Sequence, residues 1–191
     1  MNNFIKNGLT TMFLISPLYL NGMDLEIGLI GNKLYYEEKD INGKYLDSET
    51  SNFTDLYGFD LRIKQKLNDN LNLKSQLNYI IGSTEYDGST MIGNNKLNFT
   101  HEDVKKTNYI MFLEYNIFRN KELETNFEFG LGFNNWFRGN SNYSIQEIYR
   151  WYYTTIGLNN NFKINDNYDI GLNLNYNKSF KGNLYTNMLG A

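Results

Sequence analysis

Few side chains in this sequence could act as acids, bases, nucleophiles or metal ligands. The 191 residues include one histidine and no cysteine. His101 lies in Thr100-His101-Glu102-Asp103 and is the one conventional candidate for general-base chemistry. A single histidine among loop acids is usually a solvated side chain, and the spacing identifies no Ser or Asp partner. We therefore predict no catalytic residue, and keep an enzyme that uses His101 as an alternative.

Motifs that bind metals or cofactors are also missing from the sequence. One His and no Cys leave mainly carboxylates as metal ligands, and residues 37–40 lack the spacing of a calcium loop. Gly130-Leu131-Gly132 falls within a predicted strand, so it is not a phosphate-binding loop. We predict no metal and no cofactor. The net charge of −3, with scattered basic residues, argues against a nucleic-acid partner.

The composition combines many aromatic residues with low hydropathy. Aromatic residues make up 16% of the chain and the mean hydropathy is −0.55. No apolar run reaches the roughly 18 residues of a transmembrane helix, and a disordered chain would be poor in aromatics. A membrane β-barrel has an apolar outside and a polar inside, which gives low mean hydropathy together with many aromatics.

The N-terminal residues have the pattern of a secretory signal peptide. Lys6 supplies a positive charge, an apolar stretch follows at residues 9–20, and Gly22 is a small residue before Met23. The apolar stretch is short for a bilayer span, and nothing downstream is helical for it to pack on. We predict a signal peptide at residues 1–22 and a barrel domain at residues 23–191.

From Met23 onward, apolar residues recur with a period of two, which indicates strands rather than helices. In the clearest example, residues 57–64, aromatic and aliphatic residues alternate with glycine and charged residues. One face of such a strand is apolar and the other is charged. The seven predicted strands are residues 24–29, 57–64, 71–81, 109–117, 126–133, 152–159 and 168–176.

The connections between these strands alternate in length. Short turns are predicted at residues 68–70, 119–122 and 165–167, long loops at 37–52 and 84–107, and a loop of intermediate length at 139–146. Short turns on one side and long loops on the other are typical of outer-membrane barrels, in which the turns are periplasmic. We therefore predict that the long loops lie outside the cell.

The two faces of the predicted strands favour a barrel over a soluble sandwich. Tyrosines near strand ends suit an interfacial girdle, and glycines on the charged face leave room in a narrow interior. Trp136 and Trp151 are assigned to the outer aromatic girdle. Because the predicted interior charges have both signs, a salt-bridged plug is preferred to a pore lining. These charges are Glu26, Asp60, Arg62, Lys64, Lys74, Glu114, Glu128 and Asp169.

Residues 82–89, 130–136 and 149–158 carry a family resemblance. They resemble small, uncharacterised outer-membrane β-barrel proteins of the porin-like and outer-membrane-protein-A-like group. The resemblance implies the fold and the location in the outer membrane, and it identifies no catalytic residue. Such proteins normally end in a strand with a terminal aromatic, whereas this sequence ends in Met188-Leu189-Gly190-Ala191. With seven strands visible of an expected eight to ten, we expect the chain to be incomplete at its C-terminus.

Together these features predict an all-β, antiparallel, up-and-down transmembrane β-barrel in the outer membrane of a Gram-negative bacterium. The expected role is structural or surface-interacting, with a plugged lumen and no enzymatic activity. Expected partners are outer-membrane lipid and lipopolysaccharide, periplasmic chaperones and the barrel assembly machinery, for a chain that is monomeric and binds no nucleic acid. The alternatives are a narrow pore for small solutes, a barrel enzyme using His101, and a soluble lipocalin-like binder.

Overall fold

The structure, a computed structural model, describes residues 10–20, 23–89, 96–139, 145–165 and 168–188, with the backbone alone for 10–20, 89, 145, 187 and 188. No helix long and apolar enough to cross a membrane occurs among these residues. They form a ten-stranded sheet. The strands are β1 (Thr10–Leu20), β2 (Met23–Asn32), β3 (Tyr35–Lys39), β4 (Tyr45–Thr50), β5 (Leu56–Lys66), β6 (Leu71–Ser89), β7 (Lys96–Arg119), β8 (Leu123–Gly139), β9 (Ile145–Lys163) and β10 (Asp169–Met188).

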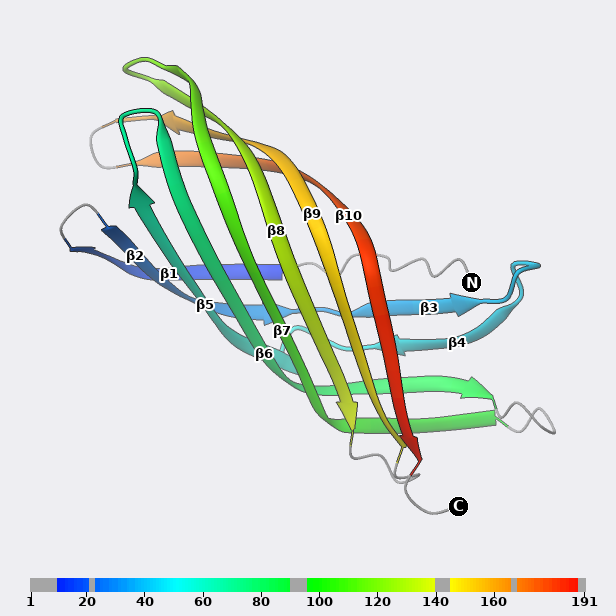
Figure 1. Ribbon diagram of the computed structural model, residues 1–191. Coiled ribbons are helices and arrows are strands. Elements are labelled where there is room, and N and C mark those ends of the chain that lie inside the picture. The colour runs from blue at the N-terminus through cyan, green and yellow to red at the C-terminus, as the bar shows by residue number, and fades with distance from the viewer. Residues whose placement is uncertain (1–9, 21–22, 90–95, 140–144, 166–167, 189–191) are drawn as a thin grey trace.

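The sheet is antiparallel and runs up and down. Its hydrogen-bonded order is β1-β2-β5-β6-β7-β8-β9-β10, and no pairing between the described parts of β1 and β10 closes it. The β3–β4 hairpin lies off this path, because residues 48–50 of β4 pair with residues 85–87 of β6. Figure 1 shows β5 to β10 side by side as a curved sheet, with the β3–β4 hairpin and the far part of the β6–β7 hairpin projecting in the same direction.

The two ends of the sheet differ. We call the end from which the β3–β4 and β6–β7 hairpins project the hairpin end, and the opposite end the turn end. Short turns at the turn end are held by asparagine side chains, as the sequence predicts. The Asn68 side chain accepts from the Asn70 N–H at 2.9 Å, and the Asn120 side chain accepts from the Leu123 N–H at 2.7 Å.

All seven predicted strands are present, as β2 and β5 to β10. The predicted long loops at residues 37–52 and 84–107 are wrong. The β3–β4 hairpin occupies most of the first, while β6 and β7 continue into the second as far as Ser89 and from Lys96. Both faces of these extensions carry polar residues, and the period-two apolar pattern is reduced to Leu97 and Phe99 in β7, too short to identify a strand.

A bulge allows β6 to continue into its extension. The register with β7 shifts between Gly82 and Thr84. Gly82 has a φ of +149°, and a Cβ built on it would lie 1.7 Å from the Asp55 carbonyl oxygen. Only glycine allows this close approach of two backbones. The bulge thereby lets the segment before β5 pack against β6.

Strand β1 lies within the residues predicted to be a signal peptide. It pairs with β2 from Thr10 opposite Asn32 to Leu20 opposite Met23. Removal of residues 1–22 stays a prediction from the sequence. It would leave β2 as an edge of the sheet.

The alternation along the strands separates an exposed apolar face from a concave polar face. On β8, Phe129 and Leu131 are exposed, whereas Glu128 and Gly130, which alternate with them, are buried. The alternation is also clear on β7 and weaker on β5 and β9, whereas the outward residues of β6 are only partly exposed. No described element covers the apolar face. This is the arrangement that the sequence predicts. It is the reverse of a soluble sandwich, which buries its apolar face.

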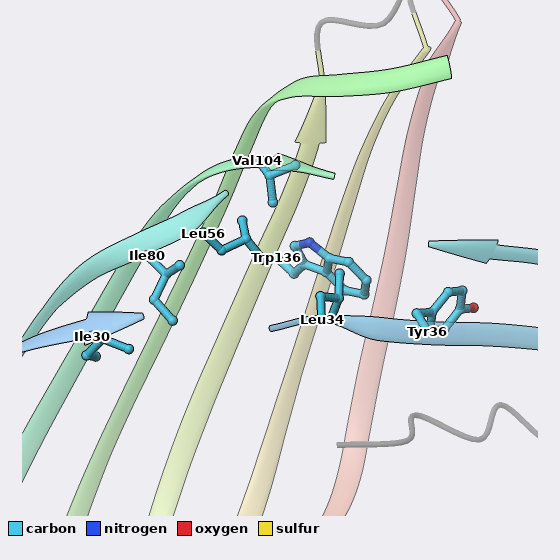
Figure 2. Close-up of a cluster of buried hydrophobic side chains, with 7 residues drawn as sticks. All are labelled: Ile30, Leu34, Tyr36, Leu56, Ile80, Val104 and Trp136. Carbon is cyan, nitrogen blue, oxygen red and sulfur yellow. The ribbon is translucent and has the colours of Figure 1, made fainter. Parts of the chain in front are cut away.

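A layer of apolar side chains lies on the concave side, which the sequence analysis did not anticipate. Figure 2 shows this cluster, which joins β2, β5, β6, β7 and β8 to the β3 hairpin. The assignment of Trp136 and Trp151 to an outer girdle is wrong: Trp136 is in this cluster and Trp151 packs against it. Both lie opposite residues of the inward face, so they point away from the exposed side. The cluster contains Ile30, Leu34, Tyr36, Leu56, Ile80, Val104 and Trp136.

Candidate functional site

A network of buried charges lines the concave face near the turn end. Lys74 lies 3.1 Å from Glu114 and 2.5 Å from Glu128, and Lys64 lies 2.7 Å from Glu114. Both glutamates are fully buried. Because the four residues come from neighbouring strands β5 to β8, the network joins the walls of the sheet to one another. Paired in this way, the charges offset much of the cost of removing each from water.

A second group of polar residues extends this network along β5. Arg62 Nε lies 2.6 Å from Asp60, and Arg62 lies 3.7 Å from Glu26 on β2. Gln76 donates to the buried Asp60 at 2.7 Å. The predicted interior charges of β2, β5, β6, β7 and β8 therefore share one face and contact one another.

These groups surround a polar cavity of about 570 Å³. Residues of β2 and of β10, near the two edges of the sheet, contribute to its lining, so the sheet curls around it. Asp169 of β10 lines the cavity, as predicted for an interior charge. Four asparagines, Asn159, Asn161, Asn173 and Asn175, supply much of its remaining polar surface.

A separate buried cluster lies at the hairpin end, centred on Arg138 of β8. Arg138 forms ion pairs with Glu49 of β4 and Glu147 of β9, and it donates to Tyr149. Thr84 of β6 also donates to Glu49. Glu49 is fully buried, and Arg138 is 4% exposed. The cluster therefore ties the β3–β4 hairpin to the far wall of the concave face.

Aromatic rings enclose the Arg138 guanidinium. Its central carbon lies 4.8 Å from the centre of the Tyr149 ring, 5.0 Å from that of Trp136 and 5.8 Å from that of Tyr36. Such cation–π contacts are strongest where water is excluded. Because Tyr36 belongs to β3, they add to the attachment of the hairpin. Arg138 thus holds the hairpin both through its ion pair with Glu49 and through its contact with the Tyr36 ring.

His101 belongs to this cluster and is not in a solvated loop, so that prediction is wrong. It is 2% exposed and lies opposite Thr84 in the β6–β7 ladder. The ring centre of Phe99 is 5.0 Å away and that of Tyr86 is 6.2 Å away. Burial lowers the pKa of His101. The histidine therefore packs as a neutral side chain among aromatic rings.

Asp47 on β4 is a further ionisable group of the hairpin end. Tyr86 donates to one of its carboxyl oxygens at 3.1 Å, and the other oxygen is buried without a hydrogen-bond partner. Burial, followed by the nearby charge of Glu38, raises the pKa of Asp47 to about 6. The hairpin thus carries a carboxyl group that favours its neutral form when docked.

The geometry of both clusters suits pairing and sealing rather than reaction chemistry. Among the described residues no group of three or more His, Cys, Asp and Glu side chains could hold a metal ion. In each cluster the carboxylates contact cations that neutralise them. The expectation that no catalytic, cofactor-binding or metal-binding residue exists stays a prediction.

Sequence analysis found the charges near the turn end and missed those at the hairpin end. Glu49 lies in a segment predicted to be a loop, and its contact with Arg138 spans 89 residues. One signal was available in the sequence. The third predicted loop is preceded by Trp136 and Arg138 and followed by Glu147 and Tyr149. Each pair is two residues apart, the spacing of side chains on one face of a strand. Those four residues share the inward face.

No protein-family model, no curated protein and no solved structure matches the chain. The structure shows an all-β, antiparallel, up-and-down sheet. The resemblance to porin-like and outer-membrane-protein-A-like barrels stays a prediction from the sequence.

Proposed function

We propose that the chain is an outer-membrane β-barrel protein with a plugged lumen and a structural or surface-interaction role. The observation that carries the proposal is the exposed apolar face of β5 to β10. Phe129 is 44% exposed, Leu131 57% and Leu174 59%, and no described element packs on them. Soluble monomers rarely expose contiguous apolar patches above a few hundred Å². Hydrocarbon lipid is the solvent that suits such a face.

The polar concave face supports the same proposal. A strand that crosses a bilayer needs hydrogen-bonded neighbours on both sides, so a spanning sheet must close. Closure around the concave face would put the ion pairs of Lys74 with Glu114 and Glu128 in the interior of a barrel. The edges available for closure are β10 and, at the other side, β1 or β2 if residues 1–22 are removed.

Two obstructions support a plugged lumen. The Arg138–Glu49 cluster fixes the β3–β4 hairpin across the concave side at the hairpin end. In addition, the apolar cluster shown in Figure 2 places side chains such as Leu56 and Trp136 on the concave side. Apolar constrictions exclude hydrated ions. We therefore propose that the protein does not conduct.

A narrow pore for small solutes is the second candidate. The observation in its favour is the polar cavity of about 570 Å³ at the turn end. For conduction, the β3–β4 hairpin and the apolar layer would have to move aside. The proposed address, the outer membrane of a Gram-negative bacterium, follows from the predicted signal peptide together with the exposed apolar face. Lipid, lipopolysaccharide, periplasmic chaperones and the assembly machinery are the proposed partners of a monomeric barrel.

The proposal is tested by folding the full chain into phosphatidylcholine vesicles and then fusing these with planar bilayers. We expect insertion, seen as heat-modifiable gel mobility, and no stable conductance. Reproducible conductance steps would favour the pore. Recovery from the native host as a soluble periplasmic protein would overturn the membrane proposal and favour a lipocalin-like binder.

A further inference from the structure

Between the turn end and the row that Lys105 forms with Phe137, the described residues on the outward face of β5 to β10 have few charges, and all of them are positive. The register from strand to strand identifies the residues that share this face, from the turn end up to the row that Lys105 forms with Phe137. Within these bounds the described residues of the face include no carboxylate. The cations lie on β7, β9 and β10 only: Lys105, Arg150, Lys178 and Lys181.

Three of these cations lie in successive rows of the face, with Arg150 nearest the hairpin end and Lys178 at the middle of the strands. Arg150 is opposite Asn183, and Lys181, two residues before Asn183 on β10, is opposite Tyr152. Neighbouring outward-facing residues on paired strands are within reach of long side chains. Lys178 follows in the next row toward the turn end, opposite Thr154. Arg150, Lys178 and Lys181 therefore form one outward-facing patch, which we call the basic patch.

The basic patch lacks the carboxylate partners that most interior cations have. Among the described residues no ion pair is formed by Arg150, Lys178 or Lys181, and all three are exposed. The Arg150 guanidinium is nevertheless held in place. Its Nε donates to Asn135 at 2.9 Å, and its central carbon lies 5.5 Å from the centre of the Tyr185 ring. Lys105, at the margin, is 2.9 Å from Asp103 and is already neutralised.

An apolar groove of about 480 Å³ lies on the same outward face, beside the patch. Tyr109, Met111 and Leu113 of β7 form one wall, and Phe129 and Leu131 of β8 form the other. The groove extends to Phe133 and Tyr152, which lie in the same row as Lys181. The groove is therefore continuous with the basic patch at its hairpin end.

We propose that the basic patch and the groove together bind one lipid whose headgroup carries anionic phosphate. Arg150 and Lys181 would hold the phosphate, with Lys178 reaching toward it from the apolar side, and an acyl chain would lie in the groove. Guanidinium and phosphate pair well because their geometries allow two parallel hydrogen bonds. A bound phosphate also supplies a negative charge near Lys178, whose own row of the outward face contains no carboxylate. This inference rests on the proposed membrane function and adds a specific lipid site to it.

The test uses the full chain folded into phosphatidylcholine vesicles that contain lipid A, a phosphorylated glycolipid, or its dephosphorylated form. Lipid that remains bound after extraction into mild detergent is measured by native mass spectrometry. The variant Arg150→Gln with Lys181→Gln removes two patch cations. The control variant is Lys33→Gln with Lys44→Gln. It makes the same change in charge at two exposed residues that lie outside the strands of the outward face.

We expect lipid A to be retained by the wild-type chain and by the control, and the dephosphorylated form to be retained much less. Each cation near a membrane surface contributes about fivefold in affinity, so the patch variant should bind lipid A about 25-fold more weakly. Equal retention by the patch variant and the control would overturn the lipid site while leaving the barrel intact. Failure of every chain to insert would overturn both proposals.

Discussion

The two charge clusters of the concave face are built differently. Near the turn end, Lys74, Glu114 and Glu128 come from three consecutive strands of the sheet, so the walls alone bring them together. At the hairpin end, Arg138 of the wall meets Glu49 of a separate hairpin, 89 residues away in the chain. The first cluster borders an open cavity, whereas in the second the central pair of Arg138 and Glu49 lies away from that cavity and is almost inaccessible to solvent.

The difference indicates that the first cluster stabilises the wall and the second fixes the plug. Loss of a charge near the turn end leaves alternative polar neighbours and water in the cavity. Loss of a charge at the hairpin end leaves a buried partner with little access to water. The clusters should therefore respond unequally to the same kind of substitution.

The largest effect is expected for Glu49→Ala. It removes one of the two carboxylates that contact Arg138, and breaking a buried ion pair costs about 3–5 kcal/mol. The remaining contact with Glu147 puts the expected loss of unfolding free energy near the lower value. Urea unfolding in vesicles would measure it. Replacing all three charges, Glu49→Leu with Arg138→Met and Glu147→Gln, should recover most of the loss, and a triple variant as unstable as Glu49→Ala would contradict this explanation.

The second-largest effect tests whether the outward face of the sheet is in contact with lipid. Phe129→Arg should destabilise the folded chain in vesicles by about 2–4 kcal/mol near the middle of the bilayer, because the guanidinium must be desolvated or draw water into hydrocarbon. Phe129→Leu is the matched control and should cost much less. If Phe129→Arg were neutral, this face would be exposed to water.

A smaller effect is expected for Glu128→Gln in the turn-end network. The amide keeps the shape of the side chain and its hydrogen bonding, and Lys74 retains its ion pair with Glu114. We expect a loss of about 1–2 kcal/mol, within the range for a hydrogen bond to a charged group. Unfolding in vesicles, compared side by side with Glu49→Ala, checks the ranking. A loss for Glu128→Gln that equals the loss for Glu49→Ala would remove the distinction between the two clusters.

The smallest effect concerns pH and the docking of the β3–β4 hairpin. The pKa of Asp47 is raised from 3.8 to about 6 by burial, so the docked state binds more protons than the undocked state between these values. Docking should therefore weaken as pH rises from about 4 to about 6, by about 1 kcal/mol given the partial exposure of the group. Hydrogen exchange of β4 amides would report it.

Asp47→Asn should abolish that part of the pH dependence. His101 acts in the opposite direction: its lowered pKa means that the docked state gains stability as pH rises toward 6.5. The difference between the wild-type chain and Asp47→Asn isolates the Asp47 contribution, since His101 is present in both. Identical pH profiles for the two chains would show that Asp47 is solvated when the hairpin is docked.

The sequence predicts the strands of the sheet and the facing of their side chains, because both depend on the alternation of residues along each strand. Period-two alternation places Asp60 and Glu128 on one face whatever the rest of the chain does. The hairpin-end cluster has no such local origin. Glu49 lies in a segment without apolar alternation, and His101 follows an alternating run that contains only Leu97 and Phe99. The burial of Glu49 depends on the pairing of β4 with β6. Trp136 was misassigned for the same reason, since the apolar layer exists only once the hairpin supplies Leu34 and Tyr36.

The facing of the sheet is tested most directly by spin labels at two adjacent residues of β10. Leu172 lies on the outward face and Asn173 lines the polar cavity, and both side chains are exposed enough to accept a label. The chain contains no cysteine, so Leu172→Cys and Asn173→Cys each give a single labelling site. In vesicles we predict that the label at 172 is relaxed by lipid-soluble oxygen and the label at 173 by a water-soluble reagent. The reverse pattern, or equal access of the water-soluble reagent to both labels, would contradict the proposal that this sheet faces lipid.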